Sequence, residues 1–352
     1  MAVDPIVLEV IRHALIATAD EMKLNLARTA HNPIIYEVLD FSVGVFDAER
    51  RMIAQADGLP IFLGSLGVAV RQVVEDIGAE RMRPGDLYLF NDPYVQGNHL
   101  NDLTTVEPVF TGDRICGYVS TRAHWLDIGG KDPGGSIDCT DIVQEGLWLR
   151  SIPLYRAGEL DDAIWRIIEY NVRYTENMLG DLRAQVAASR TGALRFREVV
   201  ERHGAATVDD AIATMLAQGE ARARAAVAEM PDGTYEAETW VDTDCVGSGP
   251  LPVRVRLTIE DSEVVADLTG CGAQVAGPVN CGLAAAVAAC RIALKAFTSP
   301  DTPATEGDFA PLTVVAPPGS RYNAVYPAPT FLYAKGLTDA TVRALTLACP
   351  ER

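Results

Sequence analysis

The sequence predicts a mixed α/β (α+β) fold in three portions: an α/β portion over residues 1–150, a helical insert or arm over 151–230, and an α+β portion over 231–352. Helical and strand-like periodicities alternate in the first portion. The middle is rich in Ala, Arg, Glu and Leu at helical spacing, and the last portion has three strand-like runs followed by an Ala-rich segment. A length of 352 residues has room for more than one such unit.

The first portion opens with a helix from Pro5 to about Ala30. Asp4 is a good N-cap, Pro5 suits the first helical turn, and the apolar residues that follow recur about every 3.6 positions. Alternating small and apolar residues then predict a hairpin from Phe41–Asp47 back through Arg51–Gln55. After it we expect a helix over 63–77, strands over 86–91, 104–110 and 115–121, and a loop rich in Gly and Asp over 128–141.

The later portions are predicted from the same signals. Helices are expected over 161–182, 194–203 and 208–230, and Pro231-Asp-Gly-Thr ends the last of them. Strands are expected over 234–241, 253–259 and 263–268, followed by a helix over 283–297.

Composition excludes several classes of partner. The chain has 30 Lys and Arg against 48 Asp and Glu, a formal net charge of −18, which argues against nucleic acid and anionic membranes. No apolar run reaches the roughly 18 residues of a membrane span, and no secretory or transit signal is recognisable, so we expect a cytoplasmic protein. The seven cysteines include no Cys-x-x-Cys pair and are expected to be reduced.

Two common catalytic signatures are missing. The sequence has no Gly-x-x-x-x-Gly-Lys-Ser/Thr phosphate loop, so the chain is not expected to bind ATP by itself. It also has no Gly-x-Ser-x-Gly elbow, which argues against a serine hydrolase.

The five histidines include two that begin a His-x-x-Asp quartet: His99 with Asp102, and His124 with Asp127. Residues i and i+3 of a strand face opposite sides, so each pair converges only on a turn, and Gly97-Asn98 supplies a bend before His99. Imidazoles with carboxylates suit Zn, Mn or Fe. The alternative is that each Asp only orients its neighbouring His within a satisfied loop.

Many ordered motifs across the chain agree with one known family. They are Asp4-Pro-Ile-Val-Leu-Glu-Val-Ile-Arg, Arg28-Thr-Ala, Asp40-Phe-Ser-Val-Gly-Val-Phe-Asp47, Asn91-Asp-Pro93, Gly97-Asn-His-Leu-Asn-Asp102, Arg122-Ala-His-Trp-Leu-Asp-Ile-Gly-Gly130, Gln144-Glu-Gly146, Pro231-Asp-Gly-Thr-Tyr235 and Gly277-Pro-Val-Asn280. Through these motifs the chain resembles the hydantoinase B / 5-oxoprolinase family, which includes metal subunits of ketone carboxylases and caprolactamase-like enzymes.

The resemblance implies a metal site in the first portion. One divalent ion (Zn, Mn or Fe) would be held by Asp40, His99, Asp102 and His124, and Asp127 would be an acid/base or metal-supporting residue. Family members are longer, so the 231–352 portion is expected to be truncated relative to them.

The resemblance also implies a partner. A hydantoinase A-like ATPase subunit, using ATP and Mg, would phosphorylate a cyclic amide of the hydantoin, oxoproline or lactam type, and this chain would complete its hydrolysis. One alternative is a subunit of an ATP-dependent acetone or acetophenone carboxylase, because both reactions use the ion as a Lewis acid. The other is a fragment that only scaffolds assembly.

Overall fold

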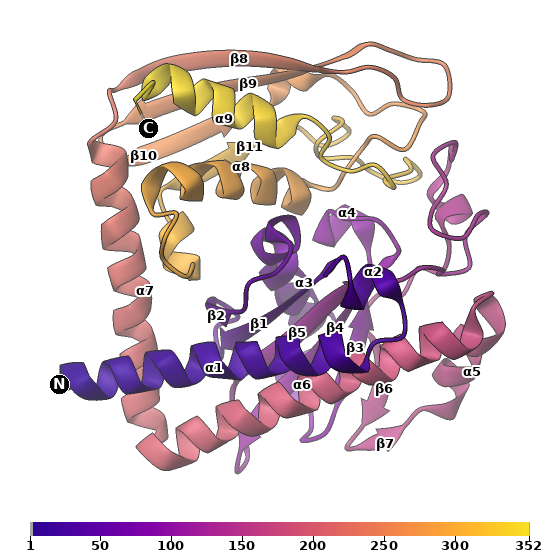
Figure 1. Ribbon diagram of the computed structural model, residues 1–352, viewed down its shortest axis with the longest axis vertical. Coiled ribbons are helices and arrows are strands. Elements are labelled where there is room, and N and C mark those ends of the chain that lie inside the picture. Colours follow the sequence, from indigo (N-terminus) through magenta and orange to yellow (C-terminus); the bar gives the residue numbers. More distant parts are fainter. Residues whose placement is uncertain (1–2, 352) are drawn as a thin grey trace.

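Two β-sheets of unequal size organise the chain, each with helices packed on it (Figure 1). The computed structural model describes residues 3–351. The larger sheet and its helices occupy the lower half of Figure 1, and the smaller sheet lies in the upper half. The long helix α7 (Ala205–Ala228) connects the two halves along the left side of the view. The mixed α/β class expected from the sequence is confirmed.

The larger sheet has seven strands in the order β2-β1-β5-β4-β3-β6-β7, and every neighbouring pair is antiparallel. The strands are β1 (Phe41–Asp47), β2 (Met52–Gln55), β3 (Leu87–Phe90), β4 (Asp102–Thr111), β5 (Arg114–His124), β6 (Ile152–Arg156) and β7 (Glu159–Leu160). All seven residues of β1 are buried, because helices cover both faces of the sheet at this point.

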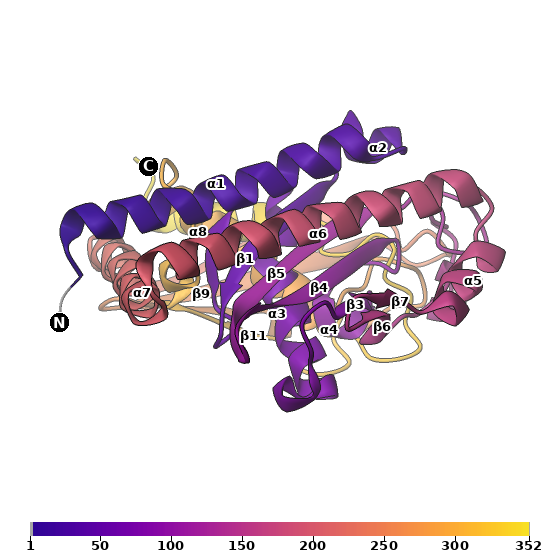
Figure 2. The same ribbon diagram turned by 90° about the horizontal axis from the view of Figure 1, so that it is seen from below.

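Helices α1 (Pro5–Thr29) and α6 (Thr175–His203) lie side by side across one face of this sheet (Figure 2). Helix α3 (Pro60–Ile77) contributes to the core on the other face. As predicted, the Asp4 carboxylate caps α1, accepting hydrogen bonds from the Ile6 and Val7 amides. Three shorter helices are α2 (Pro33–Tyr36), α4 (Pro93–Gln96) and α5 (Asp162–Asn171).

The smaller sheet has the order β11-β10-β9-β8 and is covered on one face only. Its strands are β8 (Gly233–Val241), β9 (Leu251–Glu260), β10 (Glu263–Asp267) and β11 (Leu312–Val315), and its helices are α8 (Leu283–Thr298) and α9 (Leu337–Ala348). On the open face Arg254 and Arg256 of β9 pair with Glu238 and Glu236 of β8. Helix α8 also packs against α3, which joins the two halves.

The main strands and most of the helices predicted from the sequence are present, but the division of residues 161–203 is corrected. The helix expected over 161–182 is interrupted at residues 172–174, between α5 and α6, and α6 runs on without the break expected between 182 and 194. The short elements α2, α4, β6, β7 and β11 were not predicted, since segments of two to five residues carry little periodicity. Four single 3₁₀ turns complete the list: Ala79–Arg81, Ile142–Glu145, Thr269–Cys271 and Glu306–Phe309. The three-part division stays a prediction; β6 and β7 extend the larger sheet to residue 160, and α6 packs on that sheet.

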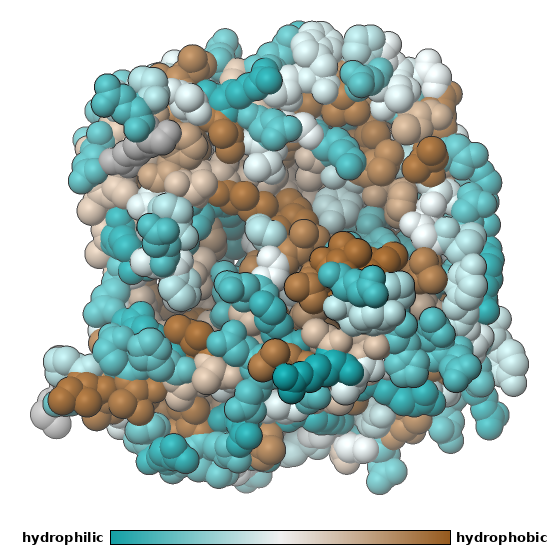
Figure 3. Space-filling view, in the orientation of Figure 1, coloured by the Kyte–Doolittle hydropathy of each residue, from teal (hydrophilic) through white to brown (hydrophobic). Residues whose placement is uncertain are grey.

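Among residues 3–351, no helix is both long enough and apolar enough to cross a bilayer. The surface does carry some exposed apolar side chains. In Figure 3 apolar side chains gather over the start of α1 and around α2, where Ile6 is 75% and Val38 is 70% exposed.

Candidate metal centre

Three of the predicted ligands lie in a row at the ends of three neighbouring strands. Asp40 directly precedes β1, His124 ends β5, and Asp102 begins β4. The register pairs Asp102 with His124, and the His124 amide donates to the Asp40 carbonyl at 3.0 Å. Directly opposed residues of an antiparallel pair have Cα atoms only about 4.5–5.5 Å apart, so the strand order itself brings these three side chains together.

The fourth predicted ligand, His99, comes from the turn between α4 and β4. Gly97 ends α4 with φ 90°, and a Cβ there would lie 2.1 Å from the Ala285 backbone nitrogen, so the position requires glycine. The Asp102 amide then donates to the His99 carbonyl at 3.2 Å, closing the turn. His99 Nδ1 lies 3.1 Å from Asp102 Oδ2, and the predicted convergence of this pair on a turn is confirmed.

His99, Asp102 and His124 are buried, Asp40 is half-buried, and several polar atoms of these four residues lack hydrogen bonds. His124 Nδ1 lies 3.4 Å from Asp102 Oδ1, and the ligand atoms of His99, Asp102 and His124 are all within 4.8 Å of one another. Among residues 3–351, Asp40 Oδ1, His99 Nδ1 and both Asp102 carboxylate oxygens have no partner in hydrogen-bonding geometry. Unsatisfied buried polar atoms are costly, and two imidazoles with two carboxylates match the donor set of a Zn, Mn or Fe site. The residues therefore fit the ion that the family resemblance implies.

The pKa shifts show how strongly these groups depend on one another. Burial, and then the charge of Asp102, raise the pKa of Asp40 to about 6. Burial also raises the pKa of Asp102. Burial and the nearby His124 lower the pKa of His99, whereas for His124 the Asp102 and Asp40 carboxylates outweigh burial and raise it. The pKa values of the two imidazoles shift in opposite directions beside two carboxylates whose pKa values both rise, so a bound cation would change the protonation of all four groups together.

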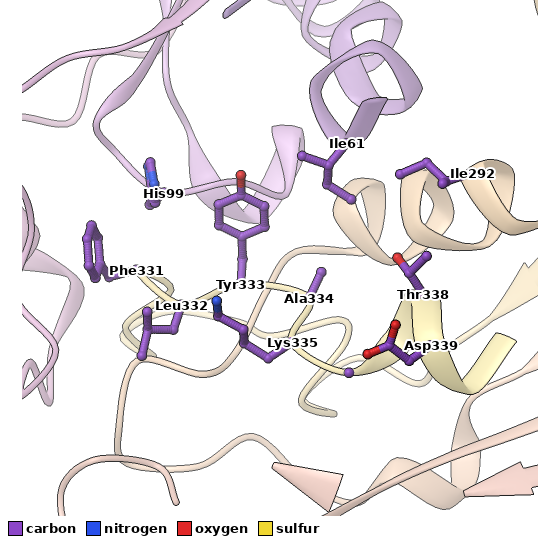
Figure 4. Close-up of a pocket in the computed structure, with 11 residues that line it drawn as sticks. Ile61, His99, Ile292, Phe331, Leu332, Tyr333, Ala334, Lys335, Thr338 and Asp339 are labelled. Atoms are coloured by element: carbon purple, nitrogen blue, oxygen red, sulfur yellow. The ribbon is translucent and has the colours of Figure 1, made fainter. Parts of the chain in front are cut away.

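Aromatic side chains and a cavity flank His99 (Figure 4). The Phe331 ring stacks on the His99 ring with centroids 5.1 Å apart, and Tyr333 meets it edge-on at 5.2 Å. The cavity has a volume of about 450 Å³. It is lined by Ile61, His99, Ile292, Phe331, Leu332, Tyr333, Ala334, Lys335, Gly336, Thr338 and Asp339. Its walls thus come from both halves of the molecule, and sequence reasoning missed them because residues 331–339 carry no motif.

Asp127 does not join the other four predicted residues. Its Oδ1 accepts from Arg173 Nη1 at 2.7 Å and from the Gly129 amide at 3.2 Å, and its Oδ2 accepts from the Arg173 amide. The chain leaves β5 after His124, so the three-residue spacing does not produce a helical turn here. The structure therefore places Asp127 in a loop bonded to Arg173, and its predicted catalytic role has no contact with the cluster to support it.

The fold and the cluster define a mixed α/β protein with a candidate mononuclear metal centre at the end of its larger sheet. The chain belongs to the hydantoinase B/oxoprolinase family, since the sequence model of that family matches residues 4–352. It is 31% identical over 99% of its length to an uncharacterized protein of Methanocaldococcus jannaschii, and 30% identical over 99% of its length to caprolactamase subunit beta of Pseudomonas jessenii. It spans 62% and 61% of these two relatives.

Solved structures agree with this assignment. The ATP-dependent caprolactamase from Pseudomonas jessenii superposes with a TM-score of 0.92 at 29% identity, over 100% of this chain and 62% of that one. An acetone carboxylase superposes with a TM-score of 0.88 over 98% of this chain and 47% of that one, but at 18% identity this likeness shows the fold alone.

Proposed function

We propose that this chain is the metal-binding subunit of a two-component, ATP-dependent hydrolase of cyclic amides. The observation that carries the proposal is the buried cluster of His99, Asp102 and His124, with the half-buried Asp40 on the neighbouring strand. Several polar atoms of these four residues are unpaired, and His99 lines a cavity. A divalent cation bound there supplies a Lewis acid.

The chain's own residues define the rest of the site. Asp40, Asp102 and His124 are held by the strand register, and His99 by the turn that Gly97 permits. Phe331 and Tyr333 shield the His99 ring from water. The apolar Ile61, Ile292 and Leu332 form walls suited to the carbon framework of a small ring, and a volume of about 450 Å³ has room for one.

The partner and reaction class are proposed from the relatives. Relatives of this chain are named caprolactamase subunit beta and 5-oxoprolinase, and both names denote the opening of a cyclic amide. Since this sequence has no phosphate loop, we assign ATP and its Mg to a separate hydantoinase A-like subunit. The ketone carboxylase alternative ranks second, because the likeness to acetone carboxylase extends to the fold alone.

Metal analysis of the purified chain tests the site. We expect about one divalent ion per chain in the wild type, and near-complete loss in His99→Ala and in His124→Ala. His13→Ala is the matched control, since the His13 side chain is 76% exposed on α1. Unchanged metal content in both site variants would reject the assignment.

Reconstitution tests the reaction. With the ATPase subunit present, we expect ATP hydrolysis to depend on 5-oxoproline, hydantoin or caprolactam, and to be lost in His99→Ala. Product formation from acetone and bicarbonate instead would favour the carboxylase. If neither reaction occurs although the metal is bound, the scaffold alternative is favoured.

A further inference from the structure

Residues 327–333, here called the strap, carry the two aromatic side chains that contact His99. The strap has no regular secondary structure, yet groups from outside it bond to it almost residue by residue. The Pro327, Ala328 and Pro329 carbonyls accept hydrogen bonds, respectively, from the Ile142 amide at 3.0 Å, the Tyr94 hydroxyl at 2.8 Å and the Asn280 side chain at 3.0 Å. The Leu332 amide donates to the Pro278 carbonyl at 2.7 Å.

The centre of the strap is held by a single carboxylate. Glu145 accepts the Thr330 amide at 2.5 Å and the Phe331 amide at 2.9 Å on Oε1, and the Thr330 hydroxyl at 3.3 Å on Oε2. Glu145 is 2% exposed, and among residues 3–351 no Lys or Arg pairs with it. A buried carboxylate without a cation is expensive unless several donors converge on it, and here every donor comes from the strap.

The loop that carries Glu145 is also shaped around the strap. Gly135, in the Gly- and Asp-rich loop before it, has φ 98°, and a Cβ there would lie 1.7 Å from the Phe331 ring. The Phe331 ring is therefore held between Gly135 and the His99 ring. Its position depends both on the strap and on the loop that contains Gly135.

We propose that Glu145 is a positioning residue for the candidate metal centre: it fixes Thr330 and Phe331 so that Phe331 and Tyr333 hold the His99 ring in place. Its effect on the metal rests on the proposed function, whereas its effect on the strap does not. Because Glu145 acts through backbone amides, glutamine can replace it: the amide oxygen accepts the same two N–H groups, and the amide nitrogen donates to the Thr330 hydroxyl.

The first measurement is amide hydrogen exchange of the metal-free, full-length chain. In Glu145→Ala we expect exchange at Thr330 and Phe331 to rise about 10–100-fold, because their hydrogen bonds to Glu145 are lost, and in Glu145→Gln to return close to the wild-type rate. Glu107→Ala is the matched control: Glu107 is 4% exposed and bonded to Arg190, away from the strap. Wild-type exchange in Glu145→Ala, or an equal rise in Glu107→Ala, would overturn the proposal.

The second measurement follows the site itself by the visible absorption of the Co²⁺-loaded chain. We expect an altered spectrum and about tenfold weaker Co²⁺ binding in Glu145→Ala, with both restored in Glu145→Gln and unchanged in Glu107→Ala. A wild-type spectrum in a Glu145→Ala variant whose strap exchanges fast would overturn the link to the metal. If the wild type binds no Co²⁺, the proposed function fails, and the exchange experiment still decides the role of Glu145 in the strap.

Discussion

Two neighbouring polar pairs on strands β4 and β5 differ in how well their hydrogen-bonding groups are satisfied. Asp102 faces His124, and two residues further along the same strands Thr104 faces Arg122. Both pairs are buried, and the two-residue repeat of a strand puts Asp102 and Thr104 on the same face. Yet the first pair belongs to the cluster with unpaired atoms, whereas each of the three guanidinium nitrogens of Arg122 donates a hydrogen bond.

The bonds of Arg122 show what a purely structural polar network looks like here. Its guanidinium donates to Thr104 Oγ1 at 2.8 Å, Ser65 Oγ at 2.7 Å, Asn98 Oδ1 at 2.9 Å and Gln96 Oε1 at 3.2 Å. These groups tie β4 and β5 to α3 and to the segment that leads into His99. The fold thus surrounds a buried cation in this layer with acceptors, although Asn98 Nδ2 itself has no partner. The unpaired carboxylate and imidazole atoms two residues away support the proposed cation site.

The largest effect is expected from breaking the satisfied network. Arg122→Met removes four buried hydrogen bonds from a guanidinium and leaves Thr104 Oγ1 and Ser65 Oγ without a donor, so we expect a loss of about 3–5 kcal/mol in the free energy of unfolding. Urea denaturation of the metal-free chain measures it. Arg114→Met, whose exposed guanidinium pairs with Asp209, is the control and should change stability little. If Arg122→Met loses less than about 1 kcal/mol, the hydrogen bonds of Arg122 do not stabilise the fold, and the proposed difference between the two pairs is wrong.

Filling the unsatisfied cluster should stabilise the fold. A divalent ion at about 100 times its dissociation constant adds about 2.7 kcal/mol to the free energy of unfolding, because the ion binds only the folded chain. Thermal unfolding with and without Zn²⁺ or Mn²⁺ measures the effect. His124→Ala should show no shift with either ion, and an equal shift in that variant would place the ion elsewhere.

The second carboxylate of β4, Glu107, sharpens the comparison through the pH dependence of stability. Glu107 is buried like Asp102 but pairs with Arg190 at 2.6 Å, and burial raises its pKa to about 7 despite this partner. The folded chain therefore binds this proton more tightly than the unfolded chain, so Glu107 makes stability fall as pH rises from about 4.5 to 7. Glu107→Gln should reduce that fall by about 2 kcal/mol.

Denaturation of wild type and Glu107→Gln at several pH values between 5 and 8 gives this difference directly. Parallel stability curves for the two proteins would contradict the raised pKa.

The smallest effect is expected at the centre of the cluster. Asp102→Asn removes a buried charge whose oxygens lie 3.1 and 3.4 Å from the His99 and His124 nitrogens but outside hydrogen-bonding geometry. We expect the metal-free chain to gain about 1 kcal/mol while losing metal retention. Stability in chelator and metal content are measured on the same preparation. A clear loss of stability in chelator would mean that Asp102 serves the fold and not a ligand.

The sequence and the structure agree best where a signal is local or regular. The Asp4 cap, the hairpin from β1 to β2, and the turn that joins His99 to Asp102 follow from neighbouring residues. The second quartet shows the limit of spacing. It repeats the pattern of the first, but the chain enters an irregular loop after β5 without a helical turn, and Asp127 bonds Arg173. Asp40 was identified only through the resemblance, since a lone Asp before a strand has no local signal of its own.

The sequence by itself determined the fold class, most of the helices and strands, and the residue types able to hold an ion, because periodicity, caps and turn chemistry act over a few residues. Tertiary structure alone decided which of these residues meet. The order β1-β5-β4 aligns Asp40, His124 and Asp102, and Glu145 holds a strap almost 190 residues further along the chain against His99. Such contacts depend on strand order and on the packing of two halves, which no local pattern of residues encodes.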